Sequence, residues 1–228
     1  MGAPGFDARF FEFYNDLSQN NEREWFQEHK SDYEALVVAP MLRFIEAMGP
    51  RLAKISEQIL AVPKRSGGSM FRIYRDTRFS KDKTPYKTHA AVQFRHRNGK
   101  DAHAPGFYFH VSPREFILGM GLWRPAAPVL EKIRRSIDEH GAAWKEARNH
   151  APFRNFFHWA GESLSRPPKG FPADHPLIGD LKRKDFIGLC ELKPPDLLRS
   201  DLVDLVAERY QTCQPPMRFL CKAVGVPF

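Results

Sequence analysis

The stretch GFYFHVSPREFILGMG, residues 106–121, decides the fold class of this chain. Aromatic and β-branched residues alternate with polar ones in both of its halves, a pattern typical of β-strands that bury one face. The triplet SPR at residues 112–114 can turn the chain between the halves. We therefore predict two antiparallel strands, over residues 106–112 and 115–121.

Two further strands are predicted upstream of this stretch. Residues 70–74 and 91–97 have the same mixture of aromatic, β-branched and polar residues. Asn98-Gly99 is a favoured pair for a hairpin turn and would join residues 91–97 to the next strand. These segments predict a central, mainly antiparallel sheet of about four or more strands within residues 70–121.

Helical patterns precede the predicted sheet. Aromatic and aliphatic residues recur three or four positions apart through residues 1–60, which places them on one side of a helix. A break at residues 18–20 separates two helices. Asn21 can cap the second one, with the Glu24 side chain bonded back to its backbone amide.

Helices are also predicted after the sheet. Pro125 and Pro128 mark the start of one helix, and another begins near Ser200. The pair Pro215-Pro216 is expected to end that last helix before a short final turn. We predict an α+β fold, with the sheet packed by N-terminal and C-terminal helices, in a single domain over residues 1–228.

The composition narrows the class of protein. With 228 residues, 42% hydrophobic content and 19 Phe, the chain can bury a substantial core without disulfides. Its three cysteines are an odd number without C-x-x-C spacing, which is typical of buried reduced thiols in a cytoplasmic protein. We find no signal-peptide pattern and no apolar run near the roughly 18 residues of a membrane span, so we expect no membrane partner.

Residues 71–88 carry the densest group of charged side chains. They have a net charge of +4, half of the formal +8 of the whole chain. Arginine forms paired hydrogen bonds to phosphate or carboxylate, and lysine adds a mobile point charge. We predict that a phosphate-containing or other anionic ligand binds here, through Arg72, Arg75, Asp76, Arg78, Asp82, Lys83, Tyr86 and Lys87.

A purely structural role for this segment is the alternative. Asp76 and Asp82 would pair with Arg78 and nearby lysines to hold an irregular loop shut, while Tyr86 fills the core. If the segment is functional, three classes remain open. It could bind a phosphorylated small molecule or nucleic acid, or dock an acidic protein as an interaction scaffold. It could also act as an enzyme on a small anionic substrate, with Asp76 or Asp82 as acid, base or metal ligand.

Three motifs carry a resemblance to a known family. The run RDTRFSKDKTPYKT at residues 75–88 resembles the signature of a widespread bacterial and fungal family of uncharacterised domains. NNEREWF at residues 20–26 and PPKGFPADHP at residues 167–176 are similar to two further elements of that family. The resemblance covers nearly the whole chain and implies a compact mixed α and β domain, with no activity attached. The chain departs from the family at residues 163–166, SLSR, where relatives tend to have a Leu-Lys-Arg run.

Other candidate residues are weaker. Lys169, before Gly170, can supply a second cation for the ligand, and Asp174 beside His175 can orient an imidazole, although adjacent side chains rarely face each other. Histidines recur every seven residues from 89 to 110, but an odd step places successive members on opposite faces of a strand. We therefore expect no metal site, and no dinucleotide or P-loop motif indicates a cofactor.

Two acidic patterns and one thiol are further candidates for catalytic groups. Asp180-Leu181-Lys182 and Glu191-Leu192-Lys193 resemble half of a nuclease motif, and we expect both to lie on solvated faces. Cys190 lies in an apolar stretch, which argues against a reactive thiolate.

Overall fold

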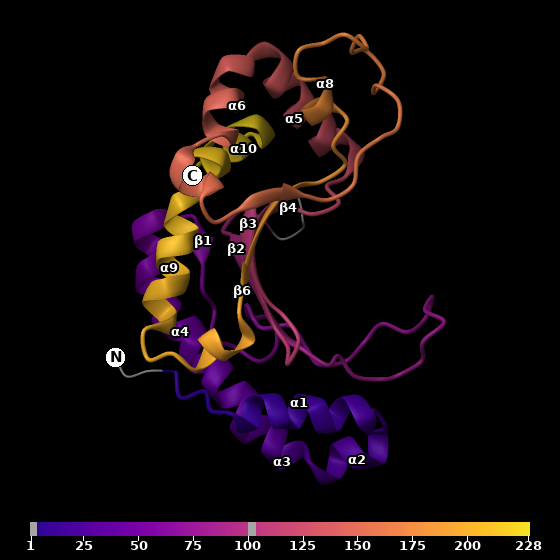
Figure 1. Ribbon diagram of the computed structural model, residues 1–228, viewed down its shortest axis with the longest axis vertical. Helices are drawn as coiled ribbons and strands as arrows, with labels where there is room; N and C mark the ends of the chain where they lie inside the picture. Colours follow the sequence, from indigo (N-terminus) through magenta and orange to yellow (C-terminus); the bar gives the residue numbers. More distant parts are fainter. Residues whose placement is uncertain (1–3, 100–103) are drawn as a thin grey trace.

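A central antiparallel sheet organises the fold. The computed structural model describes residues 4–99 and 104–228, and within them six strands form one sheet in the order β1-β2-β3-β4-β6-β5 (Figure 1). The strands are β1 (Ile59–Leu60), β2 (Ala90–His96), β3 (Gly106–Val111), β4 (Phe116–Leu122), β5 (His158–Ala160) and β6 (Phe186–Leu192). Every pairing is antiparallel. The predicted α+β class is confirmed.

Helices precede the sheet, interrupt it between β4 and β6, and follow it. They are α1 (Arg9–Gln19), α2 (Arg23–Glu28), α3 (Lys30–Asp32), the π-helix η1 (Tyr33–Val38), α4 (Ala39–Ile55), α5 (Ala127–Glu139), α6 (Gly141–Arg148), α7 (Ala151–Arg154), α8 (Ile178–Leu181), the 3₁₀-helix η2 (Pro194–Leu198), α9 (Leu202–Thr212) and α10 (Gln214–Val224). In the described part of the chain, none of these helices has the length and apolar character needed to cross a membrane.

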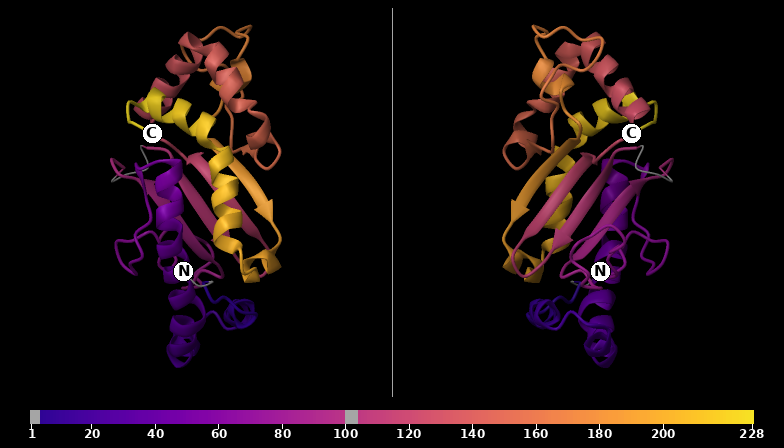
Figure 2. Two further views of the ribbon diagram at one scale, coloured as in Figure 1. Left: turned by 90° about the vertical axis from the view of Figure 1, so that its left-hand side faces the viewer. Right: turned by 90° about the vertical axis from the view of Figure 1, so that its right-hand side faces the viewer.

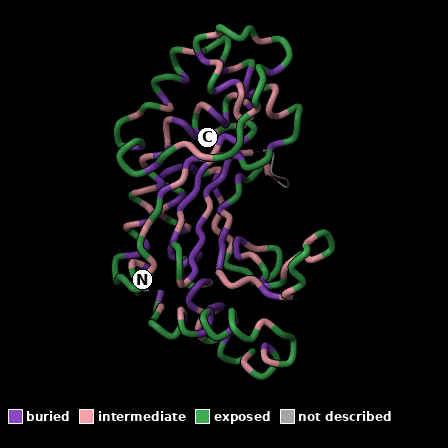
Figure 3. The backbone as a smooth tube through the Cα atoms, turned by 45° about the vertical axis from the view of Figure 1, so that its right-hand side comes forward, coloured by how far each residue is buried: buried purple, intermediate pink, exposed green. Residues whose placement is uncertain are grey.

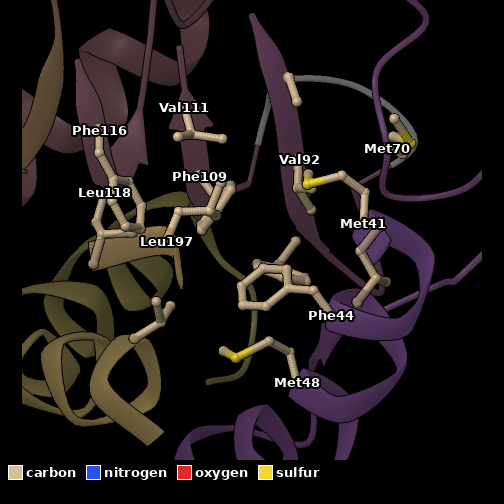
Figure 4. Packing of buried hydrophobic residues seen from close by; sticks show 14 of the residues in the cluster. Met41, Phe44, Met48, Met70, Val92, Phe109, Val111, Phe116, Leu118 and Leu197 are labelled. Atoms are coloured by element: carbon tan, nitrogen blue, oxygen red, sulfur yellow. The ribbon is translucent and has the colours of Figure 1, made fainter. Parts of the chain in front are cut away.

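One face of the sheet packs against α4 and α9 (Figure 2, left). Alternate residues of the strands point to this face because successive side chains of a strand project to opposite sides. Phe109 has no exposed surface, and its ring centre lies 4.6 Å from that of Phe44 on α4. Phe107 stacks at 4.4 Å on Tyr210 of α9. Figure 4 shows this core around Phe44 and Phe109.

The opposite face of the sheet is different, because no described helix lies over its middle (Figure 1; Figure 2, right). We call it the open face. The residues that alternate with the core residues point here, including Gln93, Tyr108 and His110. Gln93 and Tyr108 are half-buried, so part of the polar surface of the strands reaches solvent.

A second hydrophobic cluster closes one end of the sheet. Trp144 of α6 is fully buried there, with Phe186 and Phe219 at 5.8 and 5.0 Å between ring centres. The helices α5, α6, α8 and α10 supply this cluster, including Ile133 and Leu220. The three cysteines are buried and unpaired, as predicted.

The predicted strands were largely confirmed, with one exception. The segments around residues 91–97, 106–112 and 115–121 are β2, β3 and β4. Residues 70–74 are not a strand, because only Met70 and Tyr74 form isolated bridges, to Val92 and Tyr86. This segment shares one edge of β2 with β1, so neither has room for a long ladder.

Several boundaries differ from the prediction. The sheet extends beyond residues 70–121, since β1, β5 and β6 lie outside that range. The β2–β3 connection spans residues 97–105, so Asn98-Gly99 does not form a two-residue turn, and residues 100–103 lie outside the described chain. Pro215 and Pro216 begin the eleven-residue helix α10 instead of leading into a short turn, because proline is well suited to a first helical turn.

Candidate functional site

The basic segment forms a loop that projects from the body of the protein (Figures 1 and 3). The bridge between Tyr74 and Tyr86 defines its base. The Arg75 amide donates to the Pro85 carbonyl at 2.9 Å, and the Lys87 amide donates to the Ile73 carbonyl at 2.8 Å. Residues 75–85 lie beyond this paired base, and we call them the 75–85 loop.

Asn21 fastens the base of the loop to the N-terminal helices. Its side-chain amide donates to the Tyr86 carbonyl and accepts from the Tyr86 amide, both at 3.0 Å. The Tyr86 ring is 2% exposed and stacks on Phe26 of α2 with 4.2 Å between ring centres. The prediction that Asn21 caps a helix is therefore wrong, because its side chain is used in this contact and α2 begins at Arg23.

Both acidic residues of the loop pair with an arginine. Asp82 accepts from Nη1 of Arg75 and, at 2.9 Å, from the Thr84 amide, and the same Arg75 nitrogen contacts the Thr84 hydroxyl. Asp76 accepts from Nε and Nη2 of Arg78 at 2.9 and 2.7 Å. The contacts that a structural role requires are thus present in the loop.

These hydrogen bonds lower the pKa of both carboxyl groups. The pKa of Asp82 falls to about 2, first because of the Thr84 amide and then because of Arg75. The pKa of Asp76 also falls to about 2, mainly through its side-chain hydrogen bond with Arg78. Both groups are therefore carboxylates at neutral pH, which makes either one a poor proton donor.

A groove of about 630 Å³ separates the loop from α2. Its lining brings together three cations, Arg23, Arg75 and Lys83, and two acidic residues, Glu22 and Glu24. The remaining lining residues are Asn21, Gln27, Tyr74, Thr77, Pro85 and Tyr86. Tyr74 is 55% exposed and offers the groove an aromatic surface.

Arg75 and Arg78 present different donors to solvent. The Arg75 side chain is 27% exposed and bonds through Nη1, and within the described residues its Nε and Nη2 have no hydrogen-bond acceptor. Arg78 is 77% exposed, and Asp76 occupies one edge of its guanidinium, through Nε and Nη2. Lys83 donates to the Thr77 carbonyl at 2.9 Å and retains two further N–H donors.

The structure therefore divides the predicted site residues. Arg75, Lys83 and Tyr86 line the groove, and Asp82 lies behind Arg75 as its anchor. Asp76 and Arg78 pair with each other outside it. Arg72 lines a separate cavity of about 150 Å³ with Lys30 and Arg65, and Lys87 donates to the Arg72 carbonyl at 2.7 Å.

Lys169 is not brought to the groove. It is exposed on the connector at residues 161–176, which lies at the opposite end of the sheet from the 75–85 loop (Figure 1). In the same connector, His175 turns away from its neighbour Asp174 and bonds Asp138 of α5 at 3.0 Å. We assign this histidine to holding the connector against α5.

Three weaker candidates for catalytic groups lie in different environments. Asp180 is not on a solvated face, because it is 5% exposed and pairs with Arg148 and Arg183. Glu191 is exposed, as expected. Burial raises the pKa of the Cys190 thiol, which opposes formation of a thiolate.

A polar cluster on the open face was not predicted. The Tyr108 hydroxyl lies 3.1 Å from Nδ1 of His110, and Nε2 of that ring lies 3.0 Å from the Glu115 carboxylate, without good hydrogen-bond alignment. The His89 ring stacks on His110 with 4.3 Å between centres. The two-residue period of β3 places Tyr108 and His110 on one face and is the signal from which the cluster could have been found.

The described histidines spaced seven residues apart do not share one site. His96 points into the core and bonds the Pro227 carbonyl at 2.7 Å, whereas His89 and His110 meet because the turns between strands reset the phase. His103 lies outside the described residues. Among the described residues, no three His, Cys, Asp or Glu side chains are arranged to hold a metal ion.

Burial changes the ionisation of the cluster. The pKa of His89 falls to about 4, mainly through desolvation, with smaller effects from His110 and Lys87. Desolvation also lowers the pKa of His110, against an opposing effect of Glu115. Burial raises the pKa of Tyr108 to about 12. Both imidazoles and the phenol are therefore neutral at pH 7.

Comparison with family models gives a match over residues 9–219, to the family described as conserved hypothetical protein (DUF2461). The chain belongs to this family. The match spans the helices, the sheet and the 75–85 loop, so the family assignment includes the groove and the open face. No curated protein and no solved structure matches the chain.

Proposed function

We propose that the protein binds a small phosphate-bearing ligand in the groove between α2 and the 75–85 loop. The observation that carries this proposal is the state of Arg75. Its guanidinium lines the groove, is held from behind by Asp82 and Thr84, and retains Nε and Nη2 for a ligand. A cation already fixed in position loses little side-chain entropy when it binds an anion.

The other walls of the groove favour the same ligand. Lys83 and Arg23 also line the groove and add positive charge to that of Arg75, which suits an oxyanion with several acceptor oxygens. The exposed ring of Tyr74 can stack on a flat group attached to that phosphate. A nucleotide has both the phosphate and the flat group, whereas a sugar phosphate has only the phosphate.

The two acidic residues that line the groove disfavour a long ligand. Glu22 and Glu24 would repel the successive phosphates of an extended nucleic acid, whereas they can accept hydrogen bonds from the hydroxyl groups of one sugar. A small ligand is therefore favoured over an oligonucleotide.

The test is a thermal-shift and calorimetric titration with inorganic phosphate, mononucleotides, sugar phosphates and short oligonucleotides, at low and moderate salt. A selective shift by one small phosphate compound supports the proposal, because a ligand of the folded state raises the melting temperature. A broad, salt-sensitive response to oligonucleotides would support the nucleic-acid alternative instead. The absence of any shift would contradict ligand binding at this groove.

Arg75→Ala and Arg78→Ala form a matched pair for this titration. Each removes one arginine that is paired with an aspartate in the same loop. We expect Arg75→Ala to weaken binding by at least about tenfold, the loss of one charged hydrogen bond, and Arg78→Ala to change it by less than about twofold. Asp82→Ala removes the anchor and keeps the cation, so an intermediate loss is expected. Equal losses in Arg75→Ala and Arg78→Ala would show that only the overall charge matters.

A further inference from the structure

The open face contains a hydroxyl, an imidazole and a carboxylate in sequence. The Tyr108 hydroxyl is 3.1 Å from Nδ1 of His110, and the Glu115 carboxylate is 3.0 Å from Nε2 on the other side of the ring. Two-residue spacing on β3 brings the first two together, and the tight turn at residues 112–115 brings back Glu115. This order is the one in which a carboxylate orients a base that takes a proton from a nucleophile.

We propose that Tyr108 is a nucleophile for phosphoryl esters, with His110 as its general base and Glu115 as the residue that positions His110. This site is separate from the groove and does not depend on the proposed ligand there. The assignment requires the tautomer of His110 that carries its proton on Nε2, on the side of Glu115, and leaves Nδ1 to accept from the Tyr108 hydroxyl 3.1 Å away.

The pKa shifts of Tyr108 and His110 define the resting state, in which both groups are neutral and the phenol needs a base to lose its proton. The raised pKa of Tyr108 keeps the phenol protonated until a base removes the proton. The lowered pKa of His110 keeps the imidazole neutral and able to accept it. Glu115 is half-exposed and would stabilise the imidazolium that forms.

The surroundings favour an anionic substrate. Lys87 lies with its ammonium 5.5 Å from the centre of the Phe71 ring, and that ring lies 6.3 Å from the Tyr108 ring. Lys87 also lies close enough to Arg72 for that cation to lower its pKa, after the larger effect of burial. The Phe71 ring thus links Lys87 to the neighbourhood of Tyr108, where the charge of this lysine favours a negatively charged ester.

The proposed step balances as follows. The Tyr108 oxygen forms a bond to phosphorus as its proton passes to Nδ1 of His110. The bond from phosphorus to the leaving oxygen breaks, and that oxygen takes the proton from His110. Water then hydrolyses the phosphotyrosine ester with His110 again as base, which restores the phenol.

A fluorophosphonate probe tests the nucleophile directly. We expect the Tyr108 oxygen to displace fluoride, the proton to pass to His110, and peptide mass spectrometry to find the phosphonyl group on Tyr108. Tyr74 is the internal control, because it is 55% exposed and, in the described chain, has no imidazole bonded to its hydroxyl. Labelling of Tyr108 no faster than Tyr74 would overturn the proposal.

Three variants test the roles of the three residues. Tyr108→Phe should abolish labelling at this position while the protein stays folded. His110→Gln should slow labelling by about a hundredfold, the usual contribution of a general base. Because His110 is largely buried, Glu115→Gln provides a second measurement at an exposed position, with an expected loss of about fivefold to tenfold. Unchanged labelling rates in folded His110→Gln or Glu115→Gln would also overturn the proposal.

Discussion

Consecutive residues of β3 lie in opposite environments. Phe109 points to the face covered by α4 and α9 and has no exposed surface, whereas Tyr108 and His110 point to the open face. Both faces are built by the same strands, so the difference comes from the helices that cover only one of them (Figures 1 and 2). The covered face stabilises the fold, and the open face can retain polar groups because water or a ligand can satisfy them.

The largest expected effect is the loss of stability when a side chain on the covered face is truncated. Phe109→Ala should lower the free energy of unfolding by about 3–5 kcal/mol, because it leaves a cavity between Phe44 and Phe116. Tyr108→Phe, its neighbour on the open face, should cost about 1 kcal/mol, the net value of one hydrogen bond. Urea unfolding measures both. Similar losses would show that the open face is as important for stability as the covered one.

The next effect concerns protonation on the open face. His89 stays neutral in the folded protein down to about pH 4, while in the unfolded chain it takes up a proton near its ordinary pKa of 6.5. The unfolded state therefore binds more protons between these values, and stability falls as the pH falls through this window.

We expect His89 to account for about 1–2 kcal/mol of that loss, reduced from the full value by its partial exposure. The groups that face it are His110, which titrates in the same direction, and the cation Lys87. His89→Gln should flatten the dependence of the unfolding free energy on pH between 6.5 and 4. A curve with unchanged slope in this variant would place the titration elsewhere.

The smallest effect sharpens the comparison at Gly119 of β4. A methyl group there would lie 3.1 Å from Cβ of Tyr108, so the tyrosine must shift by a few tenths of an ångström. Gly119→Ala should change stability by less than about 1 kcal/mol. We nevertheless expect it to alter the Tyr108–His110 contact, seen as a shift of the His110 ring resonances in NMR. An unaltered His110 spectrum would show that the open face tolerates the added volume without movement.

The periodicity of residues 91–97, 106–112 and 115–121 was enough to predict three central strands, because each buries one face. The short strands β1 and β5 could not be predicted in this way, since two or three residues contain no period. Residues 70–74 have a strand-like composition but share the edge of β2 with β1. Which of two segments pairs along the edge of β2 depends on residues far apart in the sequence, so local composition could not predict it.

The candidate site shows the same division. Its cations were predicted as a charged group, but which of them line the groove depends on the fold, as Arg75 and Arg78 show. The contact of Asn21 with Tyr86 spans 65 residues and had no local signal. Lys169 has a suitable charge and lies at the wrong end of the sheet (Figure 1).

The amino-acid sequence alone determined the α+β class, the central antiparallel strands, the basic character of residues 71–88 and the membership suggested by three motifs. These properties depend on local composition and period, which act over a few residues. Only the tertiary structure decided that Arg75 faces a groove beside α2, that Asn21 holds the loop, and that no described helix covers the face with Tyr108, His110 and Glu115 (Figure 2). Such contacts depend on how distant segments pack, because packing selects which side chains are buried, paired or left available.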